Sequence, residues 1–526
     1  MLRSMVVFLL FCGSIVAGLG LDVVARPRPE QPDGPNVILI LLDDVDSASM
    51  QYLPEFQDLA ADGATFTNFF VTTPICCPSR VSFMRGQYAH NHDVRTNFAP
   101  DGAFGRFYEQ RLDRSTIANW LRAKKYRTAF SGKFLNGYVP PAGLKSQPSG
   151  WTDWSAIIRG HYYDFTLQVN GRRVAINTPN KNTTEALSDR AVGQINKSTS
   201  KREPFFLMIA PQAAHSPLEP DPEYAERFLD VTAPRDAAYT ETDVRDKPDW
   251  VRQWPDLTAE RQELIDENYR QRLRLLLSVD DMVRELRATL EREGIADSTY
   301  IILTSDNGWM AGAHRLEGKQ SAYDPSARVP LIIVGPGIAP GTVIDELTAN
   351  IDLAPTIADW TGAEAPAFVD GRSLVDLAVG DSVADWRDGL LIEFWRNTGT
   401  GDPEADSRLA PSASDHAYDP PLKSPDWDGD RPQVVGRPVD GTVYSISPEY
   451  LALRTADVLY VEYGTGEREF YDLQEDPAMR CNLLGNLNDD DCDGREAPSP
   501  AVVARHAERL AALASCAGES CREADQ

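Results

Sequence analysis

Two pairs of adjacent side chains carry only oxygen or amide donors, Asp43-Asp44 and Asp306-Asn307. Each pair follows closely on a run of apolar residues. Carboxylate and amide oxygens suit a hard divalent cation, and Ca²⁺ more readily than Mg²⁺, because several carboxylates crowd more easily around the larger ion. Alone, Asp-Asp would be read as a helix cap and Asp-Asn-Gly as a turn. Two such pairs at strand ends favour a metal site.

A second chemical feature is the segment Cys76-Cys77-Pro78-Ser79-Arg80. Its spacing matches neither a metal-ligand pattern nor a Cys-x-x-Cys redox pair. A free cysteine is most often a small buried hydrophobic residue, and an arginine most often a partner in a surface ion pair. Arg80 stands one helical turn after Cys76, where its guanidinium can form charge-assisted hydrogen bonds with a group near residue 76. This position favours a chemical role.

Lys133 and Lys319 each follow a glycine, and His215 stands shortly after an apolar run. A lone lysine is nearly always a solvated surface charge, and His215 also fits a structural histidine. These three residues become candidates only through their positions relative to the carboxylates. His314 is a weaker candidate of the same kind.

Continuous apolar runs predict strands that are buried on both faces. They are Asn36 to Leu42, Phe205 to Ala210, Tyr300 to Leu303 and Leu331 to Val334. Helical patterns lie between them, and the clearest has apolar residues spaced by three or four from Leu276 to Leu290 and ends at Gly294. The alternation predicts an α/β domain with a large, mostly parallel central sheet flanked by helices. Such sheets bind ligands at the carboxyl ends of their strands, so the candidate residues would meet at one edge.

The composition changes after about Gly380. Residues 402–437 are rich in Pro, Asp, Ser and Gly and are predicted to form a long loop. Strand-like segments then predict a smaller antiparallel sheet: Gly441 to Ile446, Tyr450 to Arg454, Asp457 to Tyr463 and Arg468 to Leu473. We expect a main domain at 35–380, a C-terminal α+β subdomain at 381–485 and an acidic tail at 486–526 with a short amphipathic helix near 502–513.

The 526 residues are 42% hydrophobic and 25% charged, as in an ordinary globular protein, and the net charge is −27. This charge argues against nucleic acid and anionic membranes as partners. Residues 1–26 have Arg3, an apolar stretch and small residues, which predicts a secretory signal peptide and export. The alternative, an uncleaved membrane anchor, is disfavoured because the apolar run is too short to span a bilayer.

The cysteines outside the predicted signal peptide fall into two groups. In an oxidising compartment, the group near the end of the chain is expected to form two short-loop disulfides: Cys481, Cys492, Cys516 and Cys521. Cys76 and Cys77 then remain, and neighbouring cysteines rarely bridge each other. Chemical modification of one of them would explain a pair of unpaired thiols in an exported protein.

These motifs, in this order, resemble the sulfatase family of the alkaline-phosphatase superfamily. They are P-N-V-I-L-I-L-L-D-D at 35–44, C-C-P-S-R at 76–80, G-K at 132–133, H-S-P at 215–217, S-D-N-G at 305–308 and R-V-P at 328–330. The resemblance extends from about Pro35 to Leu483. It implies an alkaline-phosphatase-like fold and a catalytic sulfatase domain at 35–380.

The resemblance also implies roles for the candidate residues. A formylglycine-generating enzyme would convert Cys76 to formylglycine, which would bind one Ca²⁺ together with Asp43, Asp44, Asp306 and Asn307. Arg80, Lys133, His215 and Lys319 would contact the modified residue or the sulfate. In the implied reaction, one hydroxyl of the hydrated aldehyde attacks sulfur, the cations stabilise the developing charge, and the second hydroxyl later expels sulfate. His215 is the candidate proton donor to the leaving oxygen.

Within the family, the segments most similar to N-acetylglucosamine-6-sulfatases and related heparan sulfatases are residues 76–80, 90–92, 132–136, 162–167 and 210–217. This similarity predicts a sulfated sugar such as glucosamine 6-sulfate as substrate, with aryl sulfates as surrogates. Two residues depart from the family pattern. Arg85 replaces a threonine of the extended signature, and Leu135 stands where many arylsulfatases have a second histidine, so the base for sulfate release is unassigned.

Three alternatives stay open: a generic arylsulfatase, a phosphomonoester or phosphodiester hydrolase of the same superfamily, and a non-catalytic binder of sulfated glycans. Dizinc hydrolases need several histidine ligands, and of the seven histidines in this chain His416 and His506 stand far from the motifs. A non-catalytic binder would be expected to lose Cys76 or the carboxylates, which are all present. The sulfatase interpretation is therefore favoured.

Overall fold

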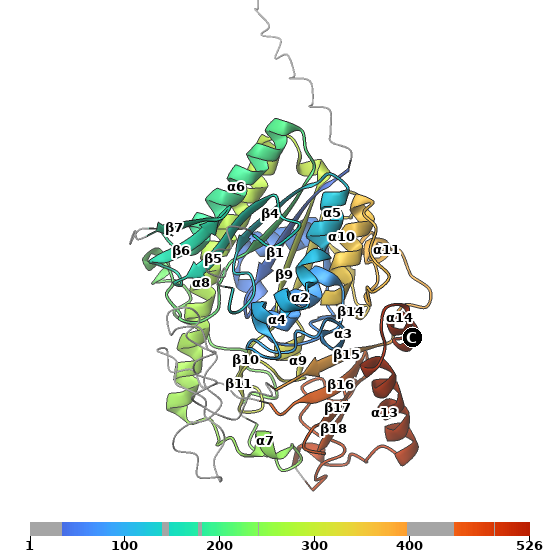
Figure 1. Cartoon of the computed structure of the whole chain (residues 1–526). Helices are drawn as coiled ribbons and strands as arrows, with labels where there is room; N and C mark the ends of the chain where they lie inside the picture. Colours follow the sequence, from blue (N-terminus) through green and yellow to red (C-terminus); the bar gives the residue numbers. More distant parts are fainter. Residues whose placement is uncertain (1–33, 139–146, 177–180, 240, 397–446, 489) are drawn as a thin grey trace, which may run out of the picture.

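The computed structural model describes residues 34–138, 147–176, 181–239, 241–396, 447–488 and 490–526. A ten-stranded sheet is its centre (Figure 1). From edge to edge, its strands are β13 (Thr342–Ile344), β2 (Ala64–Phe66), β12 (Leu331–Val334), β9 (Thr299–Ser305), β1 (Asn36–Leu42), β8 (Phe205–Ala210), β4 (Arg127–Gly132), β5 (Asp153–Arg159), β6 (Phe165–Val169) and β7 (Arg172–Ile176). The strands from β9 to β5 are parallel, which confirms the predicted mostly parallel sheet. β12, β6 and β7 are antiparallel to their neighbours.

The central strand β1 is buried on both faces of the sheet. Val37 and Leu39 belong to one apolar cluster, whereas Ile38 and Ile40 belong to another. Alternate side chains of a strand point to opposite faces, so a strand between two cores has no polar alternation. This explains the unbroken apolar run that predicted the strand.

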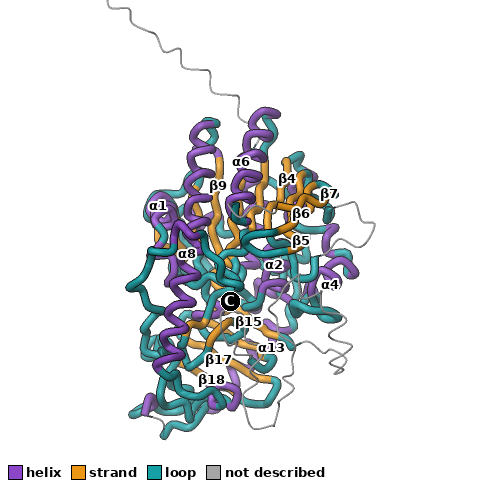
Figure 2. The backbone as a smooth tube through the Cα atoms, turned by 90° about the vertical axis from the view of Figure 1, so that its left-hand side faces the viewer, coloured by secondary structure: helices purple, strands orange, loops and turns teal. Residues whose placement is uncertain are grey.

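Helices cover both faces of the sheet (Figures 1 and 2). One face is covered by α1 (Pro54–Asp62), α6 (Thr183–Lys201) and α8 (Ala259–Arg292), and the other by α2 (Cys76–Arg85), α5 (Ile117–Ala123) and α10 (Leu353–Thr361). The helix predicted around 276–290 is the C-terminal half of α8. It ends just before Gly294, whose positive φ of 69° suits a residue without a side chain.

Short elements connect these layers. The helices are α3 (Ala89–His92), α4 (Ala103–Glu109), α7 (Asp249–Arg252), α9 (Asp324–Ala327) and α11 (Val375–Ala378), and the 3-10 helices are η1 (Ser47–Tyr52), η2 (Leu112–Arg114), η3 (Pro222–Tyr224), η4 (Ala296–Ser298), η5 (Asn350–Asp352) and η6 (Asp490–Cys492). Two strand pairs complete the main part: β3 (Phe69–Phe70) with β14 (Thr348–Ala349), and β10 (Met310–Ala311) with β11 (Glu317–Gly318).

A four-stranded antiparallel sheet forms the C-terminal part, below the large sheet in Figure 2. Its strands are β15 (Gly389–Phe394), β16 (Tyr450–Thr455), β17 (Val458–Tyr463) and β18 (Arg468–Asp472). The last three confirm predicted strands, whereas β15 was not predicted. The predicted strand at 441–446 and the predicted loop at 402–437 lie outside the described residues. The predicted boundary near residue 380 falls between α11 and β15, and the division into domains stays a prediction.

The small sheet shares an apolar core with the main part of the chain. Phe70, Ile75 and Tyr88 cluster with Leu391 and Tyr460, and all five side chains are buried. Ile75 directly precedes α2, so the C-terminal sheet supports the segment that leads into Cys76.

Hydrogen bonds to a buried carboxylate also join the small sheet to the main part of the chain. Glu469 on β18 accepts hydrogen bonds from the hydroxyls of Tyr323, Tyr463 and Tyr471 at 2.7, 2.6 and 2.6 Å. Tyr323 precedes α9 in the main part of the chain. A carboxylate buried with three donors is compatible with a stable core because its lone pairs are satisfied.

The end of the chain is folded onto this sheet. It contains α13 (Pro500–Ala514), close to the predicted helix at 502–513, and α14 (Glu519–Ala524). Disulfides join Cys481 to Cys492 and Cys516 to Cys521, which confirms two short-loop disulfides. The predicted signal peptide lies outside the described residues. Among the residues that the structure describes, no helix combines the length and apolarity needed to cross a membrane.

Candidate active site

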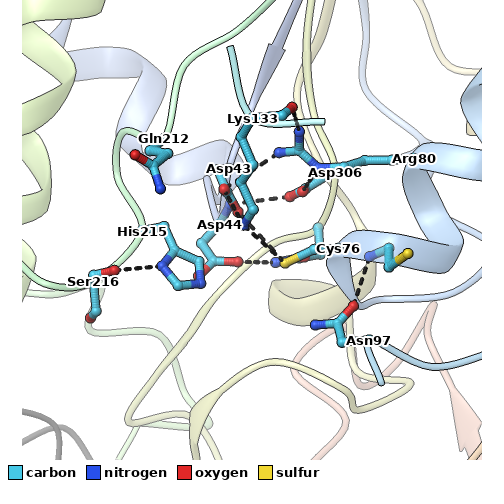
Figure 3. A network of polar contacts seen from close by, with 12 residues as sticks. Asp43, Asp44, Cys76, Arg80, Asn97, Lys133, Gln212, His215, Ser216 and Asp306 are labelled. Carbon is cyan, nitrogen blue, oxygen red and sulfur yellow. Dashed lines mark hydrogen bonds and ion pairs between the residues drawn. The ribbon is translucent and has the colours of Figure 1, made fainter. Parts of the chain in front are cut away.

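The candidate residues meet at the carboxyl edge of the parallel strands. The four strands in the middle of the sheet are β9, β1, β8 and β4. The chain continues from their carboxyl ends to Asp306, Asp43, His215 and Lys133, respectively. Because parallel strands end at the same edge, side chains from distant parts of the sequence are brought together. The structure brings together all of the residues to which the family resemblance assigns a role, and Figure 3 shows most of them.

Cys76 begins α2, and its side chain is fully buried. The sulfur lies 2.9 Å from Nζ of Lys319, 3.7 Å from Nζ of Lys133 and 3.7 Å from Oδ1 of Asp43. Burial raises the pKa of the Cys76 thiol, although both lysines act in the opposite direction. The unmodified cysteine is therefore a neutral thiol, which is a poor nucleophile.

Cations and carboxylates alternate around Cys76. Nζ of Lys133 lies 2.6 Å from Oδ2 of Asp43, and Nζ of Lys319 lies 2.7 Å from Oδ1 of Asp44. Burial acts to raise the pKa of Asp43, but Lys133 and the other surrounding cations outweigh it and hold that pKa below its ordinary value. Asp43 is therefore ionised, and the site is a fully buried ionic cluster.

Arg80 completes this cluster from the next turn of α2. Its Nε donates to Oδ2 of Asp306 at 2.7 Å, and its Nη1 donates to the carbonyl oxygen of Lys133 at 2.6 Å. Burial and the nearby Asp43 carboxylate raise the pKa of Asp306, against the pull of Arg80. The carboxylates of Asp43, Asp44 and Asp306 lie close together, so additional positive charge would stabilise their ionised forms.

The oxygen donors fit a hard cation. Ligand atoms of Asp43, Asp44, Cys76 and Asp306 all lie within 4.8 Å of one another. Among the described residues, Oδ1 of Asn307 and Oδ2 of Asp44 are buried without a hydrogen-bond partner. Buried polar atoms normally have partners, so two unpaired oxygens beside carboxylates indicate a place for a cation. The amide nitrogen of Asn307 donates to Oδ1 of Asp44 at 2.6 Å, which leaves its oxygen available.

His215 lies on the outer side of the cluster. Its Nε2 is 3.9 Å from Oδ2 of Asp44, and its Nδ1 is 2.6 Å from the carbonyl oxygen of Ser216. A carbonyl only accepts hydrogen bonds, so Nδ1 carries a proton and Nε2 faces the site. Burial and the charge of Lys133 lower the pKa of His215 to about 4, so the imidazole is neutral in the substrate-free site.

Arg272 on α8 is a site residue that the sequence interpretation missed. Its Nη2 donates to the carbonyl oxygen of Asp44, and its guanidinium lies 3.9 Å from the ring centroid of Trp309. Asp44 has a positive φ of 63°, a conformation that non-glycine residues rarely adopt. Arg272 therefore helps to hold Asp44 in this conformation. Its position between Tyr269 and Leu276 on the apolar stripe was an available signal, because a charge on such a stripe needs a partner.

Two asparagines that were not predicted hold the start of α2. The N-cap residue of this helix is Ile75, whose apolar side chain cannot accept a hydrogen bond. Instead, Oδ1 of Asn97 accepts a hydrogen bond from the backbone nitrogen of Cys77 at 2.7 Å. Nδ2 of Asn350 donates to Oγ of Ser79 at 3.1 Å. A hydrogen bond to a free N–H in the first turn stabilises a helix start, so these contacts position Cys76.

Other residues singled out by the sequence lie elsewhere. His314 is buried, and its Nδ1 lies 2.7 Å from Glu241 rather than near the carboxylates of the site. Leu135 is buried in an apolar cluster and offers no base. Arg85 donates through Nη1 to the carbonyl oxygens of Leu112 and Ser115 at 3.2 and 2.6 Å, so it anchors the end of α2.

The large, mostly parallel sheet flanked by helices is an alkaline-phosphatase-like fold, and comparisons with known proteins identify the family of this chain. A family model described as Sulfatase matches residues 35–363. Human N-acetylglucosamine-6-sulfatase is 33% identical over 507 residues, which cover 93% of this chain and 86% of that protein. An arylsulfatase of Volvox carteri is 31% identical over 529 residues, which cover 93% of this chain and 75% of that protein.

A solved structure described as a complex with its substrate D-glucosamine-2-N,6-O-disulfate has a similar fold, with a TM-score of 0.67 and 20% identity. The alignment covers 93% of this chain and 98% of that chain. The predicted fold class is thus confirmed. The chain belongs to the sulfatase family and is a sulfuric ester hydrolase.

Proposed function

We propose that this sulfatase hydrolyses sulfate esters of sugars, such as glucosamine 6-sulfate, and depends on formylglycine at position 76 and on one Ca²⁺. The setting of Cys76 supports this proposal best. The residue begins a helix, its sulfur lies 2.9 Å from Lys319 Nζ, and it faces the carboxylate of Asp43. Few structural roles for a cysteine require two lysines and several carboxylates around it.

The residues around position 76 prepare that position for nucleophilic attack. A hydrated formylglycine would supply an oxygen nucleophile, which the neutral Cys76 thiol does not. Asn97 fixes the helix start, and Lys133 and Lys319 can donate hydrogen bonds to an oxygen at this position. A nucleophile held in one orientation reacts faster because less orientational freedom is lost at the transition state.

Asp43, Asp44, Asp306 and Asn307 would hold the cation, together with residue 76. A bound divalent cation supplies Lewis acidity toward a sulfate oxygen. A set of several carboxylates with an amide oxygen favours Ca²⁺ over Mg²⁺ because the larger ion accepts more oxygen ligands. The set favours Ca²⁺ over Zn²⁺ because oxygen donors predominate over sulfur and imidazole.

The remaining cations would stabilise the sulfate group. Lys133, Lys319 and Arg80 place positive charge where the sulfate oxygens gain negative charge, in a buried site where such interactions are strong. His215 would donate a proton to the leaving oxygen through Nε2, since Nδ1 is held by the Ser216 carbonyl. The negative charge of a bound sulfate ester favours the imidazolium form that this donation requires.

The names of relatives support a sugar sulfate as substrate. N-acetylglucosamine-6-sulfatase is one such name, and the solved structure with a glucosamine disulfate is a second. The Volvox carteri relative supports a second candidate, a generic arylsulfatase. The net charge of −27 repels long polyanions, and salt screens this repulsion. We therefore expect an exo-acting enzyme whose rate on longer chains rises with moderate salt.

The compartment follows from the same proposal. The two C-terminal disulfides support export to an oxidising compartment. Maturation would then require a formylglycine-generating enzyme as partner. Mass spectrometry of the peptide that contains Cys76, after co-expression with such an enzyme, tests whether position 76 is modified.

The test of the substrate compares sulfate release from glucosamine 6-sulfate, a heparan oligosaccharide and an aryl sulfate across ionic strength. We expect turnover of both sugar substrates, with the oligosaccharide gaining most from added salt. Turnover of the aryl sulfate alone would leave a generic arylsulfatase. Much faster turnover of a phosphodiester would contradict the proposed substrate class altogether.

A further inference from the structure

Gln212 has a buried side-chain amide with an unused hydrogen-bonding atom. Its side chain is 5% exposed, and its Oε1 has no partner within the part of the chain that the structure describes. An amide carries two donors and an acceptor, and leaving one of these buried and unpaired is unfavourable. An unpaired atom of this kind next to an active site suggests that a ligand completes it.

The backbone around Gln212 is held firmly. Its carbonyl oxygen accepts from the backbone nitrogen of His215 at 2.7 Å and from the hydroxyl of Tyr162 at 3.1 Å. The same hydroxyl lies 2.6 Å from the carbonyl oxygen of His215. One turn therefore fixes the backbone from which both the Gln212 and the His215 side chains extend.

Exposure shows the side from which a substrate reaches the site. Cys76 and Asp43 are 0% exposed, whereas the side chain of His215 is 17% exposed. Figure 3 shows Gln212 beside His215, across Asp43 and Asp44 from Cys76. In an in-line displacement the leaving oxygen lies opposite the nucleophile, so the alcohol part of the substrate extends toward His215 and Gln212.

We propose that Gln212 determines substrate specificity by hydrogen-bonding a hydroxyl or amino group of the sugar beside the leaving oxygen. This inference rests on the proposed hydrolysis of sugar sulfates and assigns the recognition of their alcohol part. A sugar offers several groups that can donate to the amide oxygen or accept from its nitrogen, whereas an unsubstituted aryl ring offers none. A site built to hydrogen-bond its substrate discriminates against analogues that lack the bonding group.

Binding to an inactive background tests the inference. In Cys76→Ala protein, we compare Gln212→Leu with the unchanged glutamine by calorimetric titration of glucosamine 6-sulfate, phenyl sulfate and inorganic sulfate. We expect Gln212→Leu to weaken binding of the sugar by about fivefold to tenfold, the loss of one hydrogen bond, and to leave the other two affinities unchanged. Equal affinity of the two proteins for the sugar overturns the inference.

A matched control uses Gln194 on α6, whose amide oxygen also has no hydrogen-bond partner among the described side chains. Gln194→Leu should change none of the three affinities. An equal loss of all three affinities in Gln212→Leu would show that Gln212 acts on the sulfate or on the shape of the site, and would also overturn the inference.

Turnover by the modified enzyme separates this inference from the proposed function. Gln212→Leu should raise KM for glucosamine 6-sulfate by the same factor, with kcat/KM for the aryl sulfate unchanged. If the unsubstituted enzyme releases sulfate from neither ester, the proposed function fails, and the titrations still decide whether Gln212 recognises the sugar.

Discussion

Two buried arginines show how differently this chain treats a structural charge cluster and a functional one. Arg387 uses all three side-chain nitrogens: Nη1 and Nη2 donate to Asp352 at 2.5 and 2.8 Å, and Nε donates to Asp525 at 3.0 Å. Arg80 donates from Nε to Asp306 at 2.7 Å, but its Nη2 is buried without a hydrogen bond to any described residue. That nitrogen lies 3.4 Å from the nearest carboxylate oxygen of Asp43.

The difference indicates what each cluster is for. We call Arg387, Asp352 and Asp525 the C-terminal clamp, because they join the main part of the chain to its folded end. In the clamp, a bidentate ion pair satisfies both partners. In the candidate active site, Arg80, Asp44 and Asn307 each have a buried polar atom without a hydrogen-bond partner among the described residues. A cluster with unused polar atoms can accept a ligand, whereas a closed cluster can only stabilise the fold.

The largest effect should come from Cys76→Ala. Removing the residue proposed to carry the nucleophile should lower kcat by about 10³-fold or more, because only binding and electrostatic contributions would then remain. Cys77→Ser is the control and should retain most of the activity after modification of Cys76. Full sulfatase turnover by Cys76→Ala would show that position 76 carries no nucleophile.

Exchanging the two arginines for methionine tests the comparison directly. Arg387→Met should lower the free energy of unfolding by about 3–5 kcal/mol, because it leaves the buried Asp352 carboxylate without its ion-pair partner. Arg80→Met should lower kcat/KM by about 10²-fold and stability by less, because the proposed cation would still neutralise Asp306. Urea denaturation with calcium present, combined with steady-state kinetics, distinguishes the two outcomes. Equal losses of stability and activity in both variants would remove the distinction between the clusters.

Calcium should stabilise the site and not the clamp. At a concentration about 100 times Kd, Ca²⁺ should raise the free energy of unfolding by about 2.7 kcal/mol. Asp306→Ala should abolish both this increase and activity while the fold stays intact, since it also relieves repulsion between buried carboxylates. Thermal unfolding with calcium or a chelator measures the effect. Stoichiometric zinc without calcium or magnesium in the purified protein would refute a hard cation.

Arg272→Met should have a smaller effect on the site. Without the hydrogen bond to the Asp44 carbonyl, the strained conformation of Asp44 is held less firmly, so calcium affinity should fall by about tenfold. Trp309 fluorescence reports the lost guanidinium contact in the same variant. Arg274→Met is a control from the same helix, because Arg274 donates to the carbonyl oxygen of Arg227 instead. Unchanged calcium affinity in Arg272→Met would rule out a positioning role.

The smallest expected effect is the pH dependence of stability that arises from His90, which contacts the C-terminal end of the chain. Nδ1 of His90 lies 3.1 Å from Glu393, and its Nε2 lies 3.1 Å from the carbonyl oxygen of Cys516, so both ring nitrogens face acceptors. Burial acts to lower the pKa of His90, but Glu393 outweighs it and raises that pKa. A raised folded-state pKa gives stability that is fully present below the unfolded value of about 6.5 and is lost as pH rises through the folded value.

We therefore expect the free energy of unfolding to fall by about 1 kcal/mol between pH 6 and pH 9, the scale of one hydrogen bond. His90→Gln should remove this pH dependence of the free energy of unfolding and leave the pH dependence of sulfatase activity unchanged. Denaturation midpoints across this range, measured for both proteins, check the prediction. The same pH slope in His90→Gln would assign it to other groups.

The features that the sequence predicted depend on local patterns. The run at β1 is apolar because two cores flank it, and Asp43 follows directly where the strand ends. Parallel strands then bring Asp306 and Lys133 to the same edge without further information. Continuous apolar runs and the polar residues at their ends therefore sufficed for the strands β1, β8, β9 and β12 and for the carboxylates of the site, but not for the other strands of the large sheet.

The features that the sequence did not predict depend on distant partners. β15 forms by pairing with β16, which is distant from it in the sequence. The residues Gly389–Phe394 alone carry no pattern that predicts this pairing. The Asp44 carbonyl is 228 positions away from Arg272 along the chain. The unpaired oxygen of Gln212 is likewise a property of its neighbours in space. Such contacts are a consequence of packing and not of local sequence.

The core shared by the two sheets bears on how this enzyme unfolds. Phe70 and Ile75 pack with Leu391 and Tyr460, so removing the small sheet would expose apolar side chains directly before Cys76. Opening one part therefore carries the energetic cost of opening the other, which makes melting cooperative. The calorimetric and van't Hoff enthalpies should agree, and limited proteolysis should not release an active fragment that ends near residue 380. On this expectation, the main part of the chain does not fold as a unit separate from the small sheet.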